Sequence, residues 1–557
     1  MKKLIYITIT LLFLGLQGCA DFEEMNTDPT TSTDLDPNLQ LTTVIVERFS
    51  VPKGFRCSMS YLSAFTQTLA GAWEIGYYGG RYRQDDACGP KEDWDAFYGT
   101  CAKNSADLIY RTKDDERYAS IHAIARIFNV FQYSYLTDVW GDVPYFEAGK
   151  GYIDGTIRPK YDKQEDIYTD FFKELDEAIV ELDNTTSLPV TGDPLFQGDL
   201  TKWKKLANSL MLRFGMRVIK VNPELAKEEV TKAIAGGVMT SRDEEALIKM
   251  YNSPDDSDDR INYLAVTLNG YAGTESGVTP CATLMIYMRD TQDPRFFKYG
   301  RAYAWSDHVY HSENGDVTIN DGDDITDLLI KYSSPSTNQY CWGLIDHNGY
   351  NWSQKHDSDD LHTGATSLIP WGTIEPSIGW QEPVLLINHK LRAHDMPAVI
   401  MPYAETQFLL AEAKYRWPDL AINNTVSELY ESGLREANYI LRKYDIDVTD
   451  QEVEDFVAAN PLESGKELEQ INMQMWVLNL LNLPESFNNW RRSGYPANLV
   501  FGPGPADPLV GGTSSIPRRL FYPTFEQVDN AENFQEAIDR MGGKDDWESR
   551  VWWDVEN

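Results

Sequence analysis

Apolar residues recur every three or four positions along much of the chain, which is the spacing of one face of an α-helix. Residues 121–139 carry one such stripe, and residues 167–182 carry a cleaner one. Asp162 and Glu165, just ahead of the second stripe, fit a capping box in which Asp replaces the usual Ser or Thr. Both segments are therefore predicted to be amphipathic helices.

Further helices are predicted at short intervals. Thr201 is placed to cap a helix with an apolar face, and Asn222-Pro223 and Gly236-Gly237 are placed to begin and end the next helix. The pattern returns in the last third of the chain, over residues 401–417, 425–444, 466–481 and 524–541. Helices paired through short turns predict an all-α fold of tetratricopeptide-like helix pairs, an α/α superhelix.

The helical pattern fades between about residues 250 and 395. Gly, Pro, Ser, Asp and aromatic residues dominate this stretch. Irregular segments of this kind usually lie over a surface and carry function. We therefore expect a helical scaffold with a large loop-rich insert.

The first residues have the pattern of a secretory signal. Lys2 and Lys3 precede an apolar run that ends at Leu16, which is too short to span a membrane. The small residue Gly18 followed by Cys19 resembles a bacterial lipobox, so residues 1–18 are predicted to be a signal peptide and Cys19 to be lipidated. The alternative is an ordinary signal peptide with a coincidental Cys. Residues 19–38 have too few apolar positions to pack and are predicted to be a tether, and residues 39–557 are predicted to be the folded domain.

Charge and cysteine content exclude several classes of function. The 557 residues include 86 Asp and Glu against 50 Lys and Arg, a net charge of −36, so nucleic acid is excluded as a partner and anionic lipid headgroups are disfavoured. The six Cys show no C-x-x-C spacing and form neither a zinc ribbon nor a complete disulfide framework. A bridge from Cys88 to Cys101 is permitted outside the cytoplasm, but buried thiols are the expected state.

Several long motifs identify a family. The chain resembles the SusD/RagB-like lipoproteins, in the subgroup with the motif T-D-x-x-G-D-x-P-Y, and the likeness extends over nearly the whole chain. The matching segments are Thr137 to Tyr145, Gly198 to Arg213, Asp293-Pro294-Arg295, Ala404 to Ala413, Trp490 to Pro496, Pro517 to Pro523 and Arg550 to Asp554.

The resemblance implies both a fold and a role. Members of this family resemble one another in an all-α core of helix pairs whose irregular loops build a ligand face. They are non-catalytic surface lipoproteins that cap a SusC-like TonB-dependent outer-membrane transporter and deliver glycans, or in some branches peptides, into it. The acidic residues directly behind Cys19 resemble the signal for the outer face of the outer membrane. The motifs themselves are expected to be scaffold: Trp203 and Leu210 lie on an apolar stripe, and Gly141-Asp142 follows a helix.

Ligand residues are predicted from the chemistry of sugars. A neutral sugar presents an apolar C–H face and a rim of hydroxyls, so its binder needs aromatic platforms with polar partners. A Gly-rich stretch after a helix that ends near Ala70 supplies Trp73, Tyr77, Tyr78 and Tyr82, followed by Asp85 and Asp86. Family members often place ligand aromatics in this loop. The alternative is that these rings pack beneath the loop.

The insert is the second candidate for ligand binding. Residues 301–380 hold five of the 15 Trp, at positions 305, 342, 352, 371 and 380. Trp305, Trp342 and Trp352, with Tyr303 and Tyr310, are predicted ligand contacts. The alternative for each ring is packing against the core.

Other chemistry finds little support in the sequence. Seven of the eight His lie between His308 and His394, but without H-E-x-x-H or a comparable spacing, so no metal site is predicted. The acidic stretch Asp316–Asp327 departs from the EF-hand register and is interpreted as a turn. No nucleotide-binding or G-x-S-x-G motif is present, and no cofactor is expected. A surface glycan hydrolase and a purely structural lid on the transporter remain as alternatives.

Overall fold

The computed structural model describes residues 35–499, 501 and 513–556, apart from residues 53, 72–73, 185, 271–277, 304–307, 313–314, 321 and 328–384. Its longer helices are α3 (Pro37–Ser50), α7 (Lys103–Thr112), α8 (Ala119–Trp140), α10 (Gln164–Glu181), α11 (Leu200–Arg217), α12 (Pro223–Gly236), α13 (Tyr263–Gly270), α14 (Ala282–Asp290), α17 (Tyr403–Arg416), α18 (Val426–Tyr439), α19 (Asp450–Ala459), α20 (Glu467–Leu478), α21 (Leu483–Ser493) and α23 (Ala531–Arg540). The first of these begins just before the predicted start of the folded domain.

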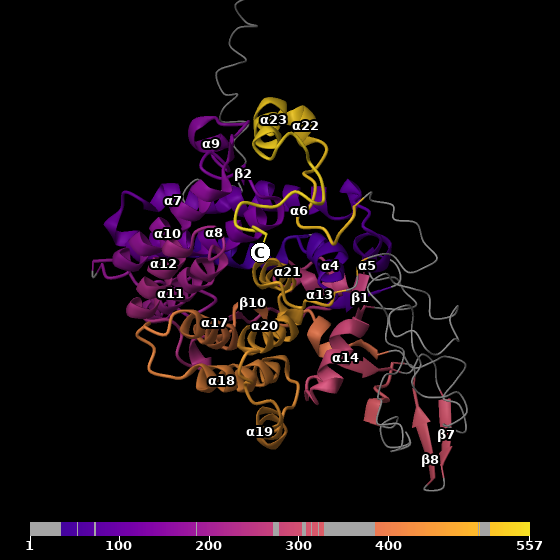
Figure 1. Ribbon diagram of the computed structural model, residues 1–557. Coiled ribbons are helices and arrows are strands. Elements are labelled where there is room, and N and C mark those ends of the chain that lie inside the picture. Colours follow the sequence, from indigo (N-terminus) through magenta and orange to yellow (C-terminus); the bar gives the residue numbers. More distant parts are fainter. Residues whose placement is uncertain are drawn as a thin grey trace, which may run out of the picture.

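The predicted helix pairs are confirmed. α8 packs on α10, α11 on α12 and α17 on α18, and α11 also contacts α17, which joins the N-terminal and C-terminal pairs. Figure 1 shows α7, α8 and α10–α12 on one side of the molecule and α17–α19 at its base. The stripes seen in the sequence form the core: Phe171, Trp203 and Leu210 are fully buried. The fold is therefore the all-α arrangement of tetratricopeptide-like helix pairs.

Short helical segments fill the connections. They are η2 (Ser58–Leu62), α4 (Ser63–Phe65), α5 (Glu74–Tyr77), η3 (Gly79–Arg81), η4 (Asp86–Cys88), α6 (Pro90–Ala96), η5 (Phe97–Ala102), η6 (Glu116–Tyr118), α9 (Gly151–Asp154), η7 (Arg242–Glu244), α15 (Phe296–Tyr299), η9 (His389–Arg392), η10 (Ile440–Tyr444), η11 (Asn479–Leu481) and α22 (Glu526–Asp529).

Strands within the described residues form only antiparallel pairs. These are β1 (Leu69–Ala70) with β5 (Thr279–Pro280), β2 (Val143–Pro144) with β3 (Tyr161–Asp162), β4 (Ala246–Ile248) with β10 (Ala398–Met401), β6 (Gly300–Ala302) with β9 (Leu385–Ile387), and β7 (His308–Ser312) with β8 (Gly315–Ile319). The β7–β8 hairpin projects from the molecule beyond α14 (Figure 1).

Two of the three predicted helix starts are wrong in detail. The carboxylate of Asp162 accepts the backbone N–H groups of Tyr145 and Phe146, at 2.9 and 2.8 Å, so it does not cap α10. Asp199, not Thr201, caps α11 by accepting two backbone N–H groups. Asn222 caps α12 with Pro223 in its first turn, and Gly237 follows its end, as predicted.

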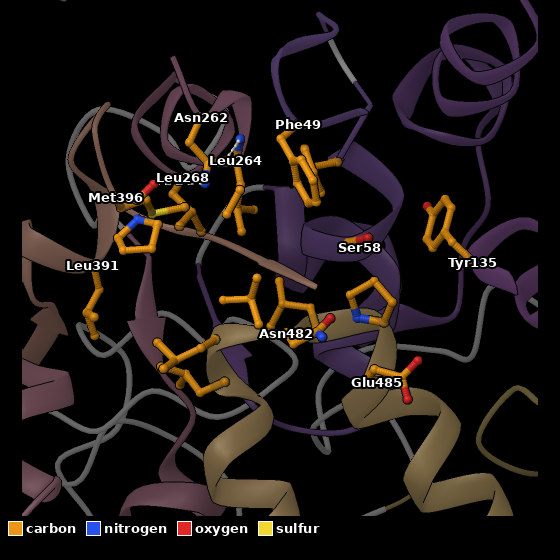
Figure 2. A pocket seen from close by; sticks show the side chains of 18 of the residues that line it. Phe49, Ser58, Tyr135, Asn262, Leu264, Leu268, Leu391, Met396, Asn482 and Glu485 are labelled. Atoms are coloured by element: carbon orange, nitrogen blue, oxygen red, sulfur yellow. Dashed lines mark hydrogen bonds between the residues drawn. The ribbon is translucent and has the colours of Figure 1, made fainter. Parts of the chain in front are cut away.

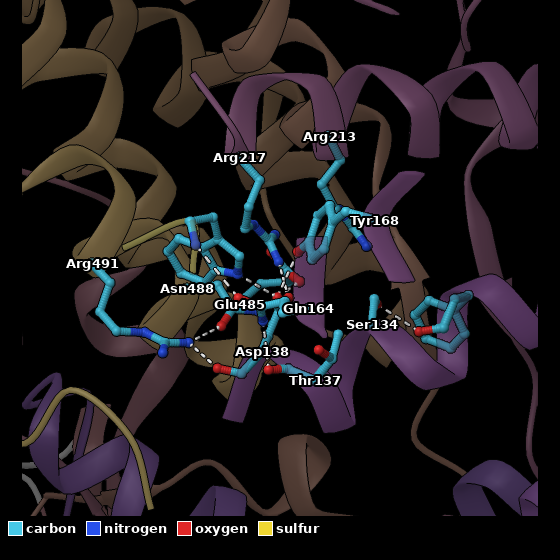
Figure 3. A network of polar contacts seen from close by, with 12 residues as sticks. Ser134, Thr137, Asp138, Gln164, Tyr168, Arg213, Arg217, Glu485, Asn488 and Arg491 are labelled. Atoms are coloured by element: carbon cyan, nitrogen blue, oxygen red, sulfur yellow. Dashed lines mark hydrogen bonds and ion pairs between the residues drawn. The ribbon is translucent and has the colours of Figure 1, made fainter. Parts of the chain in front are cut away.

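The interior of the scaffold holds a polar network centred on Asp138 of α8 (Figure 3). One carboxylate oxygen accepts from Tyr168 Oη at 2.5 Å and Trp553 Nε1 at 2.8 Å. The other accepts from Asn488 Nδ2 at 3.0 Å and from Arg217, which also pairs with Glu485. Because these partners come from α10, α11, α21 and the C-terminal segment, Asp138 joins parts of the chain that lie far apart in sequence.

The other family motifs contribute buried ion pairs of the same kind. The pairs are Arg213–Glu405, Arg492–Glu412 and Arg295–Asp293, each with little exposed side chain. Arg518 pairs with Asp554 near the C-terminus. These sequence motifs thus place paired charges inside the protein, where the carboxylates and guanidinium groups of the pairs stabilise one another.

The described residues of the insert contain more helix and strand than the sequence predicts. Within residues 250–395, α13 and α14 are helices, and β5–β9 are short strands. Cys57, Cys88, Cys101 and Cys281 are free thiols, so the permitted bridge between Cys88 and Cys101 is not formed. Among the described residues, no helix is both long and apolar enough to cross a membrane.

Candidate functional site

The predicted ligand loop is a compact segment, residues 74–83, made of α5 and η3. Glu74 anchors its start from inside the protein. Arg56 donates to both carboxylate oxygens of Glu74, at 2.7 and 3.1 Å, and Ser60 Oγ donates to one of them at 3.1 Å. Arg56 also pairs with Glu92 of α6 at 2.7 Å. The preceding helical segment ends at Phe65, and Ala70 belongs to β1.

Gly79 brings this segment against the helix below it. A Cβ atom at Gly79 would lie 2.3 Å from the carbonyl oxygen of Ser60 and 2.8 Å from the Cβ of Ala64. Only glycine permits that approach. The tyrosines next to it are therefore held close to the scaffold.

Tyr77 and Tyr78 are half-buried and meet edge to face, with ring centres 5.1 Å apart and planes at 82°. Arg83 donates to Tyr77 Oη, and its guanidinium lies 4.7 Å from the centre of the Tyr77 ring. Arg81 lies 5.7 Å from the same ring. The structure thus brings together two predicted platforms and two cations that the sequence reasoning missed. Cation–π contact holds such rings in place.

Tyr78 is held in place by contacts with Cys88 and Tyr61. Cys88 Sγ donates to Tyr78 Oη at 2.7 Å, and Tyr78 contacts Tyr61 with ring centres 6.1 Å apart. Burial raises the pKa of Tyr78 and the pKa of Cys88 above their ordinary values. Both groups are therefore neutral near pH 7, and Cys88 lacks the thiolate character of a nucleophile.

The predicted polar partners are used by the fold instead. Asp85 caps η4 by accepting Ala87 N–H at 3.1 Å. Asp86 accepts the backbone N–H of Thr524 at 2.7 Å. Between the tyrosines and these carboxylates, Gln84 both donates to and accepts from the backbone of Phe521, at 2.9 Å each way. These contacts fasten the loop to the C-terminal segment.

Two predicted platforms are core residues. Tyr82 is 1% exposed and lies between Phe65 and Phe501, with ring centres at 6.2 and 5.3 Å. Tyr303 is 8% exposed and is covered by the ring of His389, which lies parallel at 3.6 Å. Both rings therefore pack in the core and are not exposed platforms for a sugar.

Phe501 is an aromatic candidate that the sequence reasoning missed. It is 39% exposed and stacks on Tyr82 with an interplanar angle of 20°. The sequence feature that could have identified Phe501 is an aromatic residue in a Gly- and Pro-rich stretch that lacks helical periodicity. The sequence also does not predict the stacking of His389 on Tyr303. Burial lowers the pKa of His389 to about 4, so this imidazole stays neutral beside the Tyr303 ring.

The remaining predictions are not tested by the geometry. Trp73, Trp305, Trp342 and Trp352 lie outside the described residues, as does Cys19. Tyr310 lies on β7, opposite Val317 of β8, and only its backbone is described. All six stay predictions.

The helical scaffold and its buried motifs agree with comparisons to known proteins. A family model described as "starch-binding associating with outer membrane" matches residues 56–523. This chain belongs to the SusD-like family. No curated protein matches it significantly.

Solved structures of SusD-like proteins share the fold. A chitin-binding protein is 30% identical, with a TM-score of 0.73 over 94% of this chain and 100% of its own. A protein titled "Bacteroidetes AC2a SusD-like" is 31% identical, with a TM-score of 0.78 over the same shares. A SusD homologue from Bacteroides uniformis is 22% identical, with a TM-score of 0.67 over 94% of this chain and 100% of its own, and supports the fold alone. The family description refers to starch binding, and the first of these relatives is described as chitin-binding.

Proposed function

We propose that this SusD-like chain is a non-catalytic surface lipoprotein that binds a glycan and delivers it to a SusC-like TonB-dependent transporter. The observation that carries the proposal is the pair of perpendicular, half-buried rings of Tyr77 and Tyr78 with two adjacent guanidinium groups. The family description and the chitin-binding relative favour carbohydrate as the ligand class.

The site has the chemistry for a sugar. Tyr77, Tyr78 and Phe501 offer ring faces and edges for the apolar C–H surface, and Arg83 offers N–H donors for hydroxyl oxygens. A well-placed aromatic contact contributes about 0.5–1.5 kcal/mol. A few such contacts give modest affinity, which suits a carrier that must release its cargo.

Isothermal titration of the full chain, purified in non-ionic detergent, tests binding. The panel contains malto-oligosaccharides, chito-oligosaccharides and oligopeptides of similar length. We expect one glycan class to bind and Tyr77→Ala to weaken it about 2- to 13-fold, the factor that 0.5–1.5 kcal/mol represents. The matched control is Tyr110→Ala, because Tyr110 is an exposed tyrosine on α7. Silence of every ligand, or equal losses in both variants, would contradict the proposal.

Delivery and anchoring have separate tests. Cys19→Ser is expected to move the chain out of the membrane fraction if Cys19 carries lipid. Uptake of a bound glycan by cells is expected to fall in Tyr77→Ala; uptake unchanged by both Tyr77→Ala and Trp305→Ala would instead favour a structural lid. Release of reducing sugar by the pure protein would point to a hydrolase.

A further inference from the structure

A partly open cavity of about 70 Å³ lies between α3, η2, α8, α13 and the start of α21, away from the tyrosine loop (Figure 2). Apolar side chains line one end of it, including Leu268, Leu391 and Met396. Ser58 and Tyr135 lie toward the other end. The cavity therefore has a polar end and an apolar end.

Arg48 of α3 lines this cavity and is 5% exposed. Aromatic rings surround its guanidinium carbon, which lies 4.8 Å from the ring centre of Tyr135 and 5.1 Å from that of Phe55. Within the part of the chain that the structure describes, no hydrogen bond or ion pair reaches this guanidinium. Nε of this guanidinium is buried without a hydrogen-bond partner, and the ring contacts offset the desolvation cost of such a donor only in part.

The nearest carboxylates have other partners. Asp93 accepts from Tyr135 Oη at 2.5 Å and from the backbone N–H of Cys57 at 3.4 Å. Burial raises the pKa of Asp93 to about 7, although its hydrogen bonds and the nearby charge of Arg48 act to lower it, so Asp93 carries only part of a negative charge at neutral pH. Glu485, which also lines the cavity, pairs with Arg217 and accepts from Asn488 at 3.2 Å. Neither group supplies the acceptor that Arg48 lacks.

Ser58 gives a second, independent sign of a missing partner. Its side chain is 1% exposed and lines the cavity, and its hydroxyl oxygen has no hydrogen-bond partner among the described residues. A hydroxyl and a guanidinium facing one small space are suited to bind the oxygens of a carboxylate.

We propose that this cavity binds a small organic carboxylate with a short aliphatic tail. The carboxylate accepts from Arg48 and Ser58, and the tail contacts Leu268, Leu391 and Met396. One water needs about 10–15 Å³, so a cavity of about 70 Å³ has room for a small organic anion such as propionate or butyrate. The acidic surface of the chain opposes entry only weakly, since salt screens charge beyond about 8 Å. This site is separate from the glycan site and does not depend on it.

Calorimetry on the full chain in non-ionic detergent tests the proposal with butyrate as the probe. Butyramide has the same shape without the charge, and chloride has the charge without the tail. We expect butyrate to bind at least tenfold more tightly than either. We expect Arg48→Met to weaken butyrate binding at least tenfold, while Arg117→Met, which removes an exposed arginine paired with Asp115, leaves it unchanged.

Further measurements keep the proposal testable if Arg48→Met fails to fold. Leu268→Phe fills the apolar end, so it is expected to weaken butyrate binding severalfold more than acetate binding. Crystals of the unaltered protein soaked with 3-bromopropionate, whose bromine takes the place of the terminal methyl group of butyrate, are expected to show bromine beside Leu268. Butyramide binding as tightly as butyrate, unchanged binding in Arg48→Met, or density for water alone beside Arg48 would each overturn the proposal. Glycan titrations on the same samples report separately on the tyrosine site.

Discussion

Replacing Asp138 with Asn perturbs the buried network without changing its shape. In Asp138→Asn, one oxygen can still accept from Tyr168 and Trp553. The new amide nitrogen then faces two donors, Arg217 and Asn488, where a carboxylate oxygen accepted from both. Two hydrogen bonds are lost, and the buried cation of Arg217 loses one of its two ion pairs and keeps the pair with Glu485.

The expected cost is large because the site excludes water. Breaking one side of a buried, hydrogen-bonded ion pair costs about 3–5 kcal/mol. Unfolding entropy is about 2.1 cal/mol/K per residue, so a folded chain of roughly 500 residues loses about 1 °C of Tm for each 1 kcal/mol. We therefore expect Asp138→Asn to lower Tm by roughly 3–5 °C.

Differential scanning calorimetry at pH 7 measures this change. The matched control is Glu181→Gln, since Glu181 pairs with His122 and Arg126 but its side chain is 24% exposed. Such a pair contributes about 0–1 kcal/mol, so its Tm should fall by less than about 1 °C. If the Tm falls by the same amount in both variants, or if Asp138→Asn is as stable as the unaltered protein, the network does not stabilise the scaffold.

Three further expectations follow from local geometry and charge. Gly79→Ala forces a Cβ against a backbone carbonyl, so it should lower the free energy of unfolding by about 1–3 kcal/mol and weaken glycan binding. The control Gly99→Ala places its Cβ where no atom lies within 4 Å, so it should be neutral or stabilising, and equal Tm values for the two variants would refute this. Burial raises the pKa of Asp93 to about 7, so the folded state favours its protonated form, and this stability is lost as pH rises from about 4 to 7. Asp93→Asn should flatten that part of a curve of Tm against pH, and an unchanged slope would contradict the expectation. Burial opposes ionisation of Glu412, yet Arg492 lowers its pKa to about 2. The stability that Glu412 contributes is therefore present above about pH 4.5 and is lost as pH falls toward 2. The Tm difference between Glu412→Gln and the unaltered protein should shrink over that range, and a constant difference would contradict this.

Local chemistry explains which parts of the fold the sequence predicts well. Asn222 caps α12 because its cap hydrogen bond, to Leu225 N–H, lies within one turn. Asp162 fails as a cap because β2 and β3 pair, and that pairing presents the N–H groups of Tyr145 and Phe146 to its carboxylate. Pairing between distant segments is not encoded in the spacing of one segment.

The missed helices have a different cause. α13 is apolar on several sides, and most of its described residues are buried, so it lacks the polar face that makes a helix recognisable by period. α14 is short and mixes Met, Leu and Tyr in the same way. The sequence pattern therefore does not distinguish α13 and α14 from the irregular residues around them.

Aromatic residues show the limit of reasoning from position alone. A ring outside a helical stripe was expected to be exposed, yet Tyr82 is buried because Phe501 covers it from another part of the chain. Tyr77 and Tyr78 remain half-exposed because Gly79 holds them at the edge of the scaffold. The difference between platform and core depends on which distant segment comes to rest on each ring.

The link between Gln84 and Phe521 has a consequence for how the protein is made. These residues are 437 positions apart, and the Asp138–Trp553 contact spans 415 positions. A chain synthesised N-terminus first cannot complete the tyrosine loop or the central network until its last residues have been made. Prematurely terminated products thus lack both, and these parts of the fold form only once nearly all of the polypeptide is present.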